Sequence, residues 1–227
     1  MLPAYNEAAA LEANLSELWE YLSRLTERYR WNLVVVNDGS TDSTGALAEN
    51  FAAGKPDVRV IHHDANRGLS EALRTAFTAL NEDFVITLDA DLSYAPSHIE
   101  RMLTAAEQTG AEIVLASPYM PGGRVSNVPL ARHALSRLAN VYLAGRLGGR
   151  LHTFTAVARV YRRDALTLPV SGDVNFQVLA EALRRGAKIV EVPAHLHWRS
   201  RSRRTSPARI GHRIGEVLRF GKQLSHA

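Results

Sequence analysis

The chain has 227 residues, of which 46% are hydrophobic, and it contains no cysteine. This length fits one large domain or one domain with an appendage, and the lack of cysteine excludes disulfides, thiolate metal sites and a cysteine nucleophile. No apolar run approaches the roughly 20 residues of a membrane-spanning helix, and we expect no signal peptide. The net charge of +4 is uneven, because eleven Lys and Arg residues lie between Arg184 and Lys222. Such a basic segment suits an anionic substrate, an anionic membrane surface or nucleic acid.

Helices and strands alternate along the first half of the chain. Leu11, Leu15 and Leu18 recur at the spacing of an amphipathic helix, whereas the following apolar runs are short and rich in β-branched residues. This alternation predicts an α/β fold with a mainly parallel sheet between two layers of helices. The expected helices span residues 8–29, 43–53, 70–80 (with Ser70 as N-cap) and 97–109, and the expected strands span residues 32–37, 58–61, 84–88 and 112–116.

The second half of the sequence is less regular. Prolines and glycines predict a loop over residues 118–129, and His195 and His197 alternate as they would on a strand. The remaining expected elements are helices over residues 130–147 and 174–185, a β-rich stretch over 153–161, a strand over 187–192 and a basic amphipathic helix over 207–224.

The start of the chain is unusual for a parallel α/β sheet. Pro3 follows Met1 so closely that almost no room is left for a strand before the first helix. We therefore expect the sheet to lack this central strand, at a cost in stability.

Two carboxylates follow the apolar run at residues 84–88. Asp89 and Asp91, separated by Ala90, stand where a buried strand reaches solvent, and carboxylate oxygens are preferred ligands of Mg²⁺ and Mn²⁺. Ligands of parallel sheets bind at the carboxyl ends of strands, and Asp38 falls at the end of another strand. The alternative interpretation of residues 89–91 is that they are only a polar strand end before a turn. Other segments of the sequence decide between a metal site and this alternative.

Four segments together resemble the family-2 glycosyltransferases of GT-A fold, in particular the polyprenyl-phosphate sugar transferases, the group that includes dolichyl-phosphate mannose synthase. They occur in the order and at the spacing typical of that family, and the likeness continues to about Arg204. It implies a GT-A, Rossmann-like three-layer sandwich over residues 1–204, followed by a basic amphipathic helix over 205–227. The four segments are residues 3–7 (PAYNE), 36–42 (VNDGSTD), 66–68 (NRG) and 89–91 (DAD).

The resemblance implies a site for a nucleotide sugar and for Mg²⁺ or Mn²⁺. Asp89 and Asp91 would hold the cation against the diphosphate, with Asp91 also counted as catalytic. Ser93 stands where the family often has a glutamine ligand, so a shorter hydroxyl or water would take that place. The residues expected to bind the nucleotide sugar are Pro3, Tyr5, Asn6, Glu7, Val36, Asp38, Asp89 and Ala90.

The acceptor implied by the resemblance is a polyprenyl phosphate. Its phosphate is ionised near neutral pH and needs positive charge to approach the donor. Arg132 is the candidate catalytic cation, with Arg199 and Arg201 as further contacts. The implied reaction is an inverting transfer of mannose from GDP or glucose from UDP, by a cytoplasmic protein peripheral to the inner face of the membrane.

Three alternatives stay open at this point. The same donor site could serve a hydroxyl or protein acceptor, or the domain could bind a nucleotide without turnover, since Ser93, Pro118 and Thr153 depart from the family pattern. Nucleic acid is the partner we expect least, because few aromatic side chains lie among the basic residues.

Overall fold

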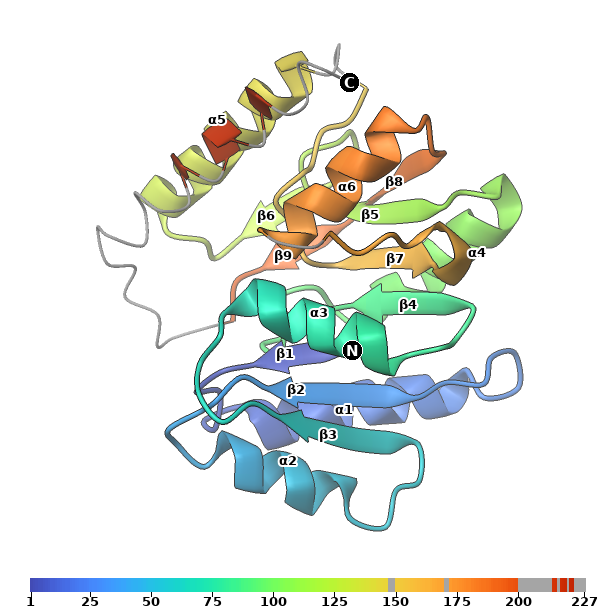
Figure 1. Cartoon of the computed structure of the whole chain (residues 1–227), viewed down its shortest axis with the longest axis vertical. Helices are drawn as coiled ribbons and strands as arrows, with labels where there is room; N and C mark the ends of the chain where they lie inside the picture. The colour runs from blue at the N-terminus through green and yellow to red at the C-terminus, as the bar shows by residue number, and fades with distance from the viewer. Residues whose placement is uncertain (147–149, 170–171, 200–213, 216, 220, 223–227) are drawn as a thin grey trace.

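The computed structural model describes residues 1–146, 150–169, 172–199, 214–215, 217–219 and 221–222. A group of three strands and a group of four lie side by side through the middle of the molecule (Figure 1). One group has the order β3–β2–β1 and the other β4–β7–β5–β8. Only β7 is antiparallel to its neighbours, which confirms the mainly parallel sheet. The strands are β1 Leu2–Ala4, β2 Leu33–Asn37, β3 Val58–His62, β4 Phe84–Thr87, β5 Ile113–Ser117, β7 Arg159–Arg162 and β8 Ile189–Pro193.

Met1 joins the two groups of strands. Its α-amino nitrogen donates to the carbonyl oxygen of Ile86 at 2.7 Å, and its own carbonyl accepts from the Leu88 amide at 3.2 Å. This is the hydrogen-bond pattern of a parallel bridge between Met1 and Thr87. The expectation that the first strand is missing is therefore wrong: β1 is present, and it lies between β2 and β4.

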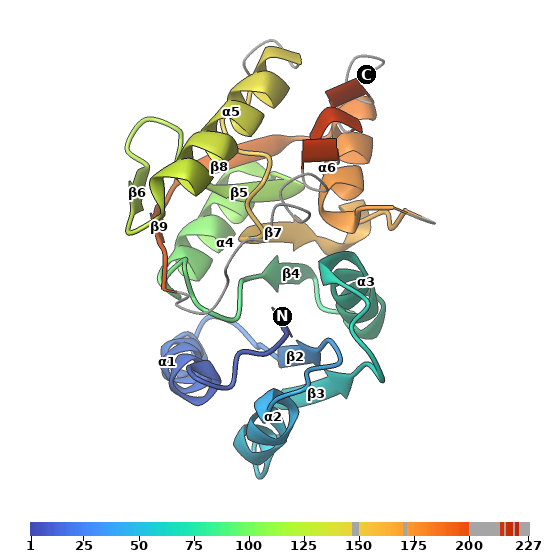
Figure 2. The ribbon, with the colours of Figure 1, turned by 90° about the vertical axis from the view of Figure 1, so that its left-hand side faces the viewer.

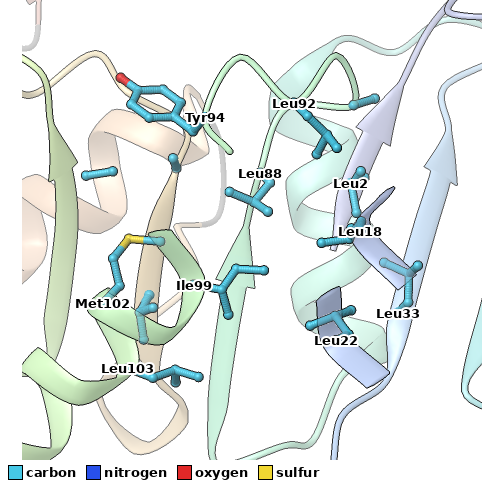
Figure 3. Close-up of a cluster of buried hydrophobic side chains, with 14 of the residues drawn as sticks. Leu2, Leu18, Leu22, Leu33, Leu88, Leu92, Tyr94, Ile99, Met102 and Leu103 are labelled. Carbon is cyan, nitrogen blue, oxygen red and sulfur yellow. The ribbon is translucent and has the colours of Figure 1, made fainter. Parts of the chain in front are cut away.

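Helices cover both faces of the sheet, as Figure 2 shows. Helices α1, α2 and α4 pack on one face with a core that includes Leu18, Met102 and Leu103 (Figure 3). Helices α3, α5 and α6 pack on the other face around Phe77, Leu143 and Leu179. The GT-A-like three-layer arrangement is confirmed. The helices are α1 Leu11–Arg24, α2 Thr44–Ala52, α3 Leu69–Ala79, α4 His98–Thr109, α5 Leu130–Arg146 and α6 Val174–Arg184.

Several expected boundaries are corrected by long-range contacts. Helix α3 begins after Gly68, so Ser70 is not the N-cap; its hydroxyl accepts from the Val174 amide instead. Within residues 118–129 lies a short strand, β6 Arg124–Ser126, which pairs with β9 His195–His197. Residues 153–158 are not a strand, and the Asn140 and Glu191 side chains accept hydrogen bonds from the backbone amides at their start, residues 153–155. The expected helix at 207–224 lies mostly outside the described residues.

Candidate active site

The turn after β4 carries the two expected metal-binding carboxylates. Asp89 and Asp91 are both partly exposed, whereas Ala90 between them is buried. The Leu92 amide donates to the Asp89 carbonyl at 3.0 Å, and the Ser93 amide donates to Asp91 Oδ1 at 2.9 Å. Leu92 takes a left-handed conformation with φ of 47°, which costs a non-glycine residue of order 1–3 kcal/mol. The fold therefore holds this turn in one tight shape.

Two elements that are distant in the sequence, α1 and β9, form hydrogen bonds to this turn. The Asn14 side chain on α1 donates to the Ala90 carbonyl at 2.9 Å in a buried contact, and the His197 amide on β9 donates to the Ser93 carbonyl at 2.8 Å. Asn14 interrupts the apolar stripe of α1 beside Leu11 and Leu15, and this is the sequence signal by which its role could have been found. The position of the carboxylates thus depends on α1 and β9 as well as on β4.

The Ser93 side chain fits the ligand role that the resemblance gives it. Its Oγ is buried and has no hydrogen-bond partner among the described residues, and an unsatisfied buried hydroxyl costs roughly 1–3 kcal/mol. Across the described residues, no three His, Cys, Asp or Glu side chains gather as a metal site. A pair of carboxylates with one hydroxyl suits a cation that takes its other ligands from substrate phosphates and water.

The segment leaving β1 is locked to the loop after β2. The Asn6 amide donates to Ser40 Oγ at 3.0 Å, the Asn6 side-chain oxygen accepts from the Thr41 amide at 2.8 Å, and the Glu7 amide donates to Thr44 Oγ1 at 2.8 Å. Pro3 lies within β1 and Tyr5 follows it, both partly exposed. These expected donor contacts are therefore brought together on one rim, the side to which β1, β2 and β4 point in Figure 1.

Val36 and Asp38 reach this rim in different ways. The Val36 side chain is fully buried, so only its backbone is available to a ligand. The Asp38 carboxylate is also buried and accepts from His63 Nδ1 at 2.7 Å. It also accepts from the Asn66 side chain and from the Arg67 and Gly68 amides at 2.8–3.0 Å. Asp38 thereby holds the loop of residues 66–68 against the end of β2, and its contact with a nucleoside stays a prediction.

The cationic residues expected at the acceptor side are not all in one place. The Arg132 guanidinium on α5 lies 4.0 Å from the ring centroid of Trp198, a cation–π arrangement. Arg199 instead forms a two-pronged ion pair with Glu17 on α1, with nitrogen–oxygen distances of 2.7 and 3.3 Å. Arg201 lies outside the described residues. Arg132 and Arg199 therefore lie on different elements with different partners, and the role of each toward an acceptor stays a prediction.

His98 is a buried histidine that the sequence did not single out. Its Nδ1 lies 2.9 Å from the Ala95 carbonyl, and its Nε2 accepts from the His195 amide of β9 at 3.0 Å. The ring must therefore be neutral, with its proton on Nδ1. Burial lowers the pKa of His98 below its ordinary 6.5, because an imidazolium is penalised away from water.

We expect the stability of the fold to fall as the pH falls below 6.5. As the pH falls, the unfolded chain binds a proton on His98 before the folded chain does. The contribution of neutral His98 to the free energy of unfolding is therefore full above pH 6.5, and it is lost as the pH falls to the lower pKa of the folded state. Urea unfolding at about pH 7.5 and about pH 5.5 measures the difference. In His98→Gln the pH dependence should shrink, and an unchanged dependence would assign it to other groups.

Tyr94 follows the carboxylate turn in the chain and belongs to the same buried cluster as Leu88 and Leu92 (Figure 3). It is buried, and burial together with the nearby Asp89 carboxylate holds the pKa of Tyr94 well above its ordinary value. Its hydroxyl therefore stays protonated at any working pH and is a neutral neighbour of Asp89.

Comparison with known proteins identifies the family. The model for "Glycosyl transferase family 2" matches residues 1–168. The chain belongs to glycosyl transferase family 2. Polyprenol monophosphomannose synthase of Mycolicibacterium smegmatis is 35% identical in an alignment 204 residues long, which covers 85% of this chain and 74% of that protein. Undecaprenyl-phosphate mannosyltransferase of Micrococcus luteus is 32% identical in an alignment 232 residues long, gaps included, which covers 97% of this chain and 92% of that protein.

Solved structures support the fold of this family-2 glycosyltransferase. Glucosyl-3-phosphoglycerate synthase of Mycobacterium tuberculosis matches with a TM-score of 0.73 and 21% identity, over 99% of this chain and 79% of that one. The same enzyme in complex with Mn²⁺ and UDP-glucose matches with a TM-score of 0.70 and 23% identity, over 97% of this chain and 77% of that one.

Among the helices that the structure describes, none combines the length and apolarity of a bilayer span.

Proposed function

We propose that this family-2 glycosyltransferase moves a hexosyl group, mannose or glucose, from a GDP- or UDP-sugar to a polyprenyl phosphate, with inversion at the anomeric carbon. The observation that carries the proposal is the rim on which the Asp89–Asp91 turn, the segment after β1 and the loops held by Asp38 meet. The relatives named for polyprenyl-phosphate substrates support the acceptor.

On the donor side, Asp89, Asp91 and Ser93 would hold a Mg²⁺ or Mn²⁺ ion. Such an ion would supply positive charge to the nucleoside diphosphate as it leaves. The backbone around Asn6 and Val36, with the Asp38-held loop, would bind and orient the nucleoside. Because these groups are fixed by hydrogen bonds between distant segments, the site is preorganised and little ordering is needed on binding.

On the acceptor side, no protein base is needed, because a phosphate monoester is already ionised near neutral pH. Its oxygen attacks the anomeric carbon of the sugar as the bond from that carbon to the donor phosphate breaks. Arg132 would offset the repulsion between the two phosphates, and its stacking on Trp198 at 4.0 Å fixes where its charge lies.

The test is incubation with labelled GDP-mannose or UDP-glucose and a polyprenyl phosphate, with and without Mn²⁺. We expect a labelled glycolipid with one donor, and no product after EDTA. Labelled protein or free oligosaccharide in place of glycolipid would overturn the proposed acceptor, and full activity in EDTA would overturn the metal.

We also propose that the protein docks on the membrane through the outer face of α5. Leu130, Leu138 and Val141 recur at eight- and three-residue spacing there and are 87%, 68% and 62% exposed, far more than large apolar side chains usually are. Arg137 lies on the same exposed side. Apolar residues flanked by positive charge suit an anionic lipid surface, and the acceptor is itself a lipid.

The expected result of Leu138→Glu with Val141→Glu is a loss of about ten-fold or more in binding to phosphatidylglycerol vesicles. The matched control is Asn50→Glu with Gln108→Glu, which adds the same charge on α2 and α4, across the sheet from α5. Equal losses in both double variants, measured by vesicle sedimentation, would mean that charge alone and not this face governs binding.

A further inference from the structure

Two histidines of β9 project from the exposed face of a small ribbon. Strands β6 and β9 pair in parallel and form a two-stranded sheet of their own, the β6–β9 ribbon (Figure 2). His195 and His197 are separated by one residue, so both lie on the same face of β9, and both are exposed. Leu196 between them is partly buried and packs against the core under α1 and α4. The transfer reaction proposed above uses neither imidazole.

The two imidazoles point at one oxygen on the neighbouring strand. Ser126 of β6 is the register partner of His197, and its Oγ lies 2.7 Å from His195 Nε2 and 2.9 Å from His197 Nδ1. The two ring centroids are 6.0 Å apart. A hydroxyl has a single proton, so it donates to one neutral imidazole and accepts from the other. The fold therefore already gathers two ring nitrogens and one oxygen around a single point.

Such a set of atoms suits a divalent cation that prefers nitrogen ligands. Imidazole is a ligand of Zn²⁺, Cu²⁺ and Ni²⁺, and zinc–nitrogen bonds are about 2.0–2.1 Å long. A cation held by both nitrogens would replace the hydroxyl proton between the rings, with Ser126 Oγ beside it. Because both rings are exposed, water can complete a tetrahedral shell.

The ribbon touches the carboxylate turn but differs from it in ligand chemistry. The His197 amide donates to the Ser93 carbonyl at 2.8 Å, which is a contact between backbones. Among the described residues, no three His, Cys, Asp or Glu side chains gather as a metal site, so the two imidazoles do not join Asp89 and Asp91 in one group. Carboxylates favour Mg²⁺ and Mn²⁺, whereas imidazoles favour Zn²⁺. The two sites should therefore be separable by the choice of metal.

We propose that His195, His197 and Ser126 form a binding site for Zn²⁺, or for another divalent cation that prefers imidazole, on the β6–β9 ribbon. The bound cation would fasten β9 to β6, two strands about 70 residues apart in the chain. This property is independent of the proposed sugar transfer and of the metal that the transfer would use.

Arg124 is the one charge of the ribbon that opposes a cation. It is the register partner of His195 and is exposed, so it starts from the same face of the ribbon. Repulsion between exposed charges is small and is screened by salt, so the imidazoles decide the affinity. Arg124→Gln should tighten Zn²⁺ binding at low salt by roughly two- to five-fold.

The test is a calorimetric titration of the full chain, without an affinity tag, with ZnCl₂ in excess Mg²⁺. We expect His195→Gln and His197→Gln each to weaken Zn²⁺ binding by about ten-fold or more. The matched control is His152→Gln, because His152 is also an exposed histidine and its Nδ1 lies 2.8 Å from a Glu191 carboxylate oxygen. This control should bind Zn²⁺ like the unsubstituted chain. Equal Zn²⁺ binding by His195→Gln, His197→Gln and the unsubstituted chain would overturn the site.

A second measurement locates the cation. Zn²⁺ should move the ¹⁵N chemical shifts of His195 Nε2 and His197 Nδ1 and leave those of His152 unchanged. Repeating the titration with Asp91→Asn should give the same Zn²⁺ affinity, because the ribbon site does not use that carboxylate. Loss of Zn²⁺ binding in Asp91→Asn, or shifts confined to other histidines, would overturn the proposal and leave the proposed transfer untouched.

Discussion

Asp91→Asn is expected to lower the rate of sugar transfer by about 10²–10³-fold, because it removes half of the carboxylate charge that would hold the cation. The substitution keeps an oxygen at the Oδ1 position, which accepts from the Ser93 amide at 2.9 Å. The turn should therefore keep its shape, and the loss should reflect the missing charge. Steady-state transfer assays across a Mn²⁺ titration measure it, and the Mn²⁺ concentration for half-maximal activity should rise.

The matched control for this prediction is Asp57→Asn. Asp57 is an exposed carboxylate just before β3, at the opposite end of the sheet from the carboxylate turn, so its loss changes the net charge equally without touching the rim. A direct readout is nucleotide-sugar binding by calorimetry with and without Mn²⁺. If Asp91→Asn binds the donor with the same Mn²⁺ enhancement as Asp57→Asn, the turn after β4 is not the metal site.

The sequence alone predicted correctly those elements that are marked by local patterns, such as a continuous apolar run or a terminal glycine. All five residues of β2 are buried, as expected for a central parallel strand with helices on both faces. Gly110 ends α4 in the left-handed conformation that favours glycine. The Asp89–Asp91 pair was placed at a strand end correctly, because it follows the largely apolar run of β4 and Leu88 directly.

Elements that depend on partners far along the chain were missed or misassigned. Strand β6 is three residues long and partly exposed, and it exists because β9 pairs with it about 70 residues later. Residues 153–158 include β-branched side chains but form a loop, whose first three amides bind the side chains of Asn140 and Glu191. No local pattern encodes these contacts, in the same way that none encodes the ion pair between Arg199 and Glu17.

The expectation that the sheet lacks its first strand was wrong, because β1 is stabilised by its neighbours. The same contacts position the residues of the rim. A strand of three residues is too short to be stable by itself, but β1 is paired on both sides, with β2 by register and with β4 through Met1. Its short length leaves Asn6 and Glu7 close to the loop after β2, where side-chain hydroxyls bind their amides. The donor rim is thus held by contacts of the loops as well as by the pairing of the strand.

Gly39→Ala is expected to destabilise the fold by about 3 kcal/mol, combining backbone strain with overpacking. Gly39 follows Asp38 with φ of +62°, and a Cβ there would lie 2.1 Å from the carbonyl carbon of Ala65 and 2.4 Å from the Asn66 nitrogen. Both atoms belong to backbone, so neither can rotate away as a side chain would. The loop of residues 66–68 must move, and its hydrogen bonds to the Asp38 carboxylate would lengthen or break.

Gly54→Ala is the matched control, because Gly54 has a similar φ of +74° but a Cβ there meets nothing within 4 Å. It carries the strain of a left-handed alanine without the collision, so it should cost only about 1 kcal/mol. Urea unfolding of the two variants isolates the collision, and donor binding separates its consequence for the rim, since only Gly39→Ala displaces the Asp38-held loop. If the two variants lose the same free energy of unfolding and donor binding is unchanged, the backbone at Ala65 and Asn66 moves aside at little cost. The close contact of Gly39 with these residues would then not determine the shape of the site.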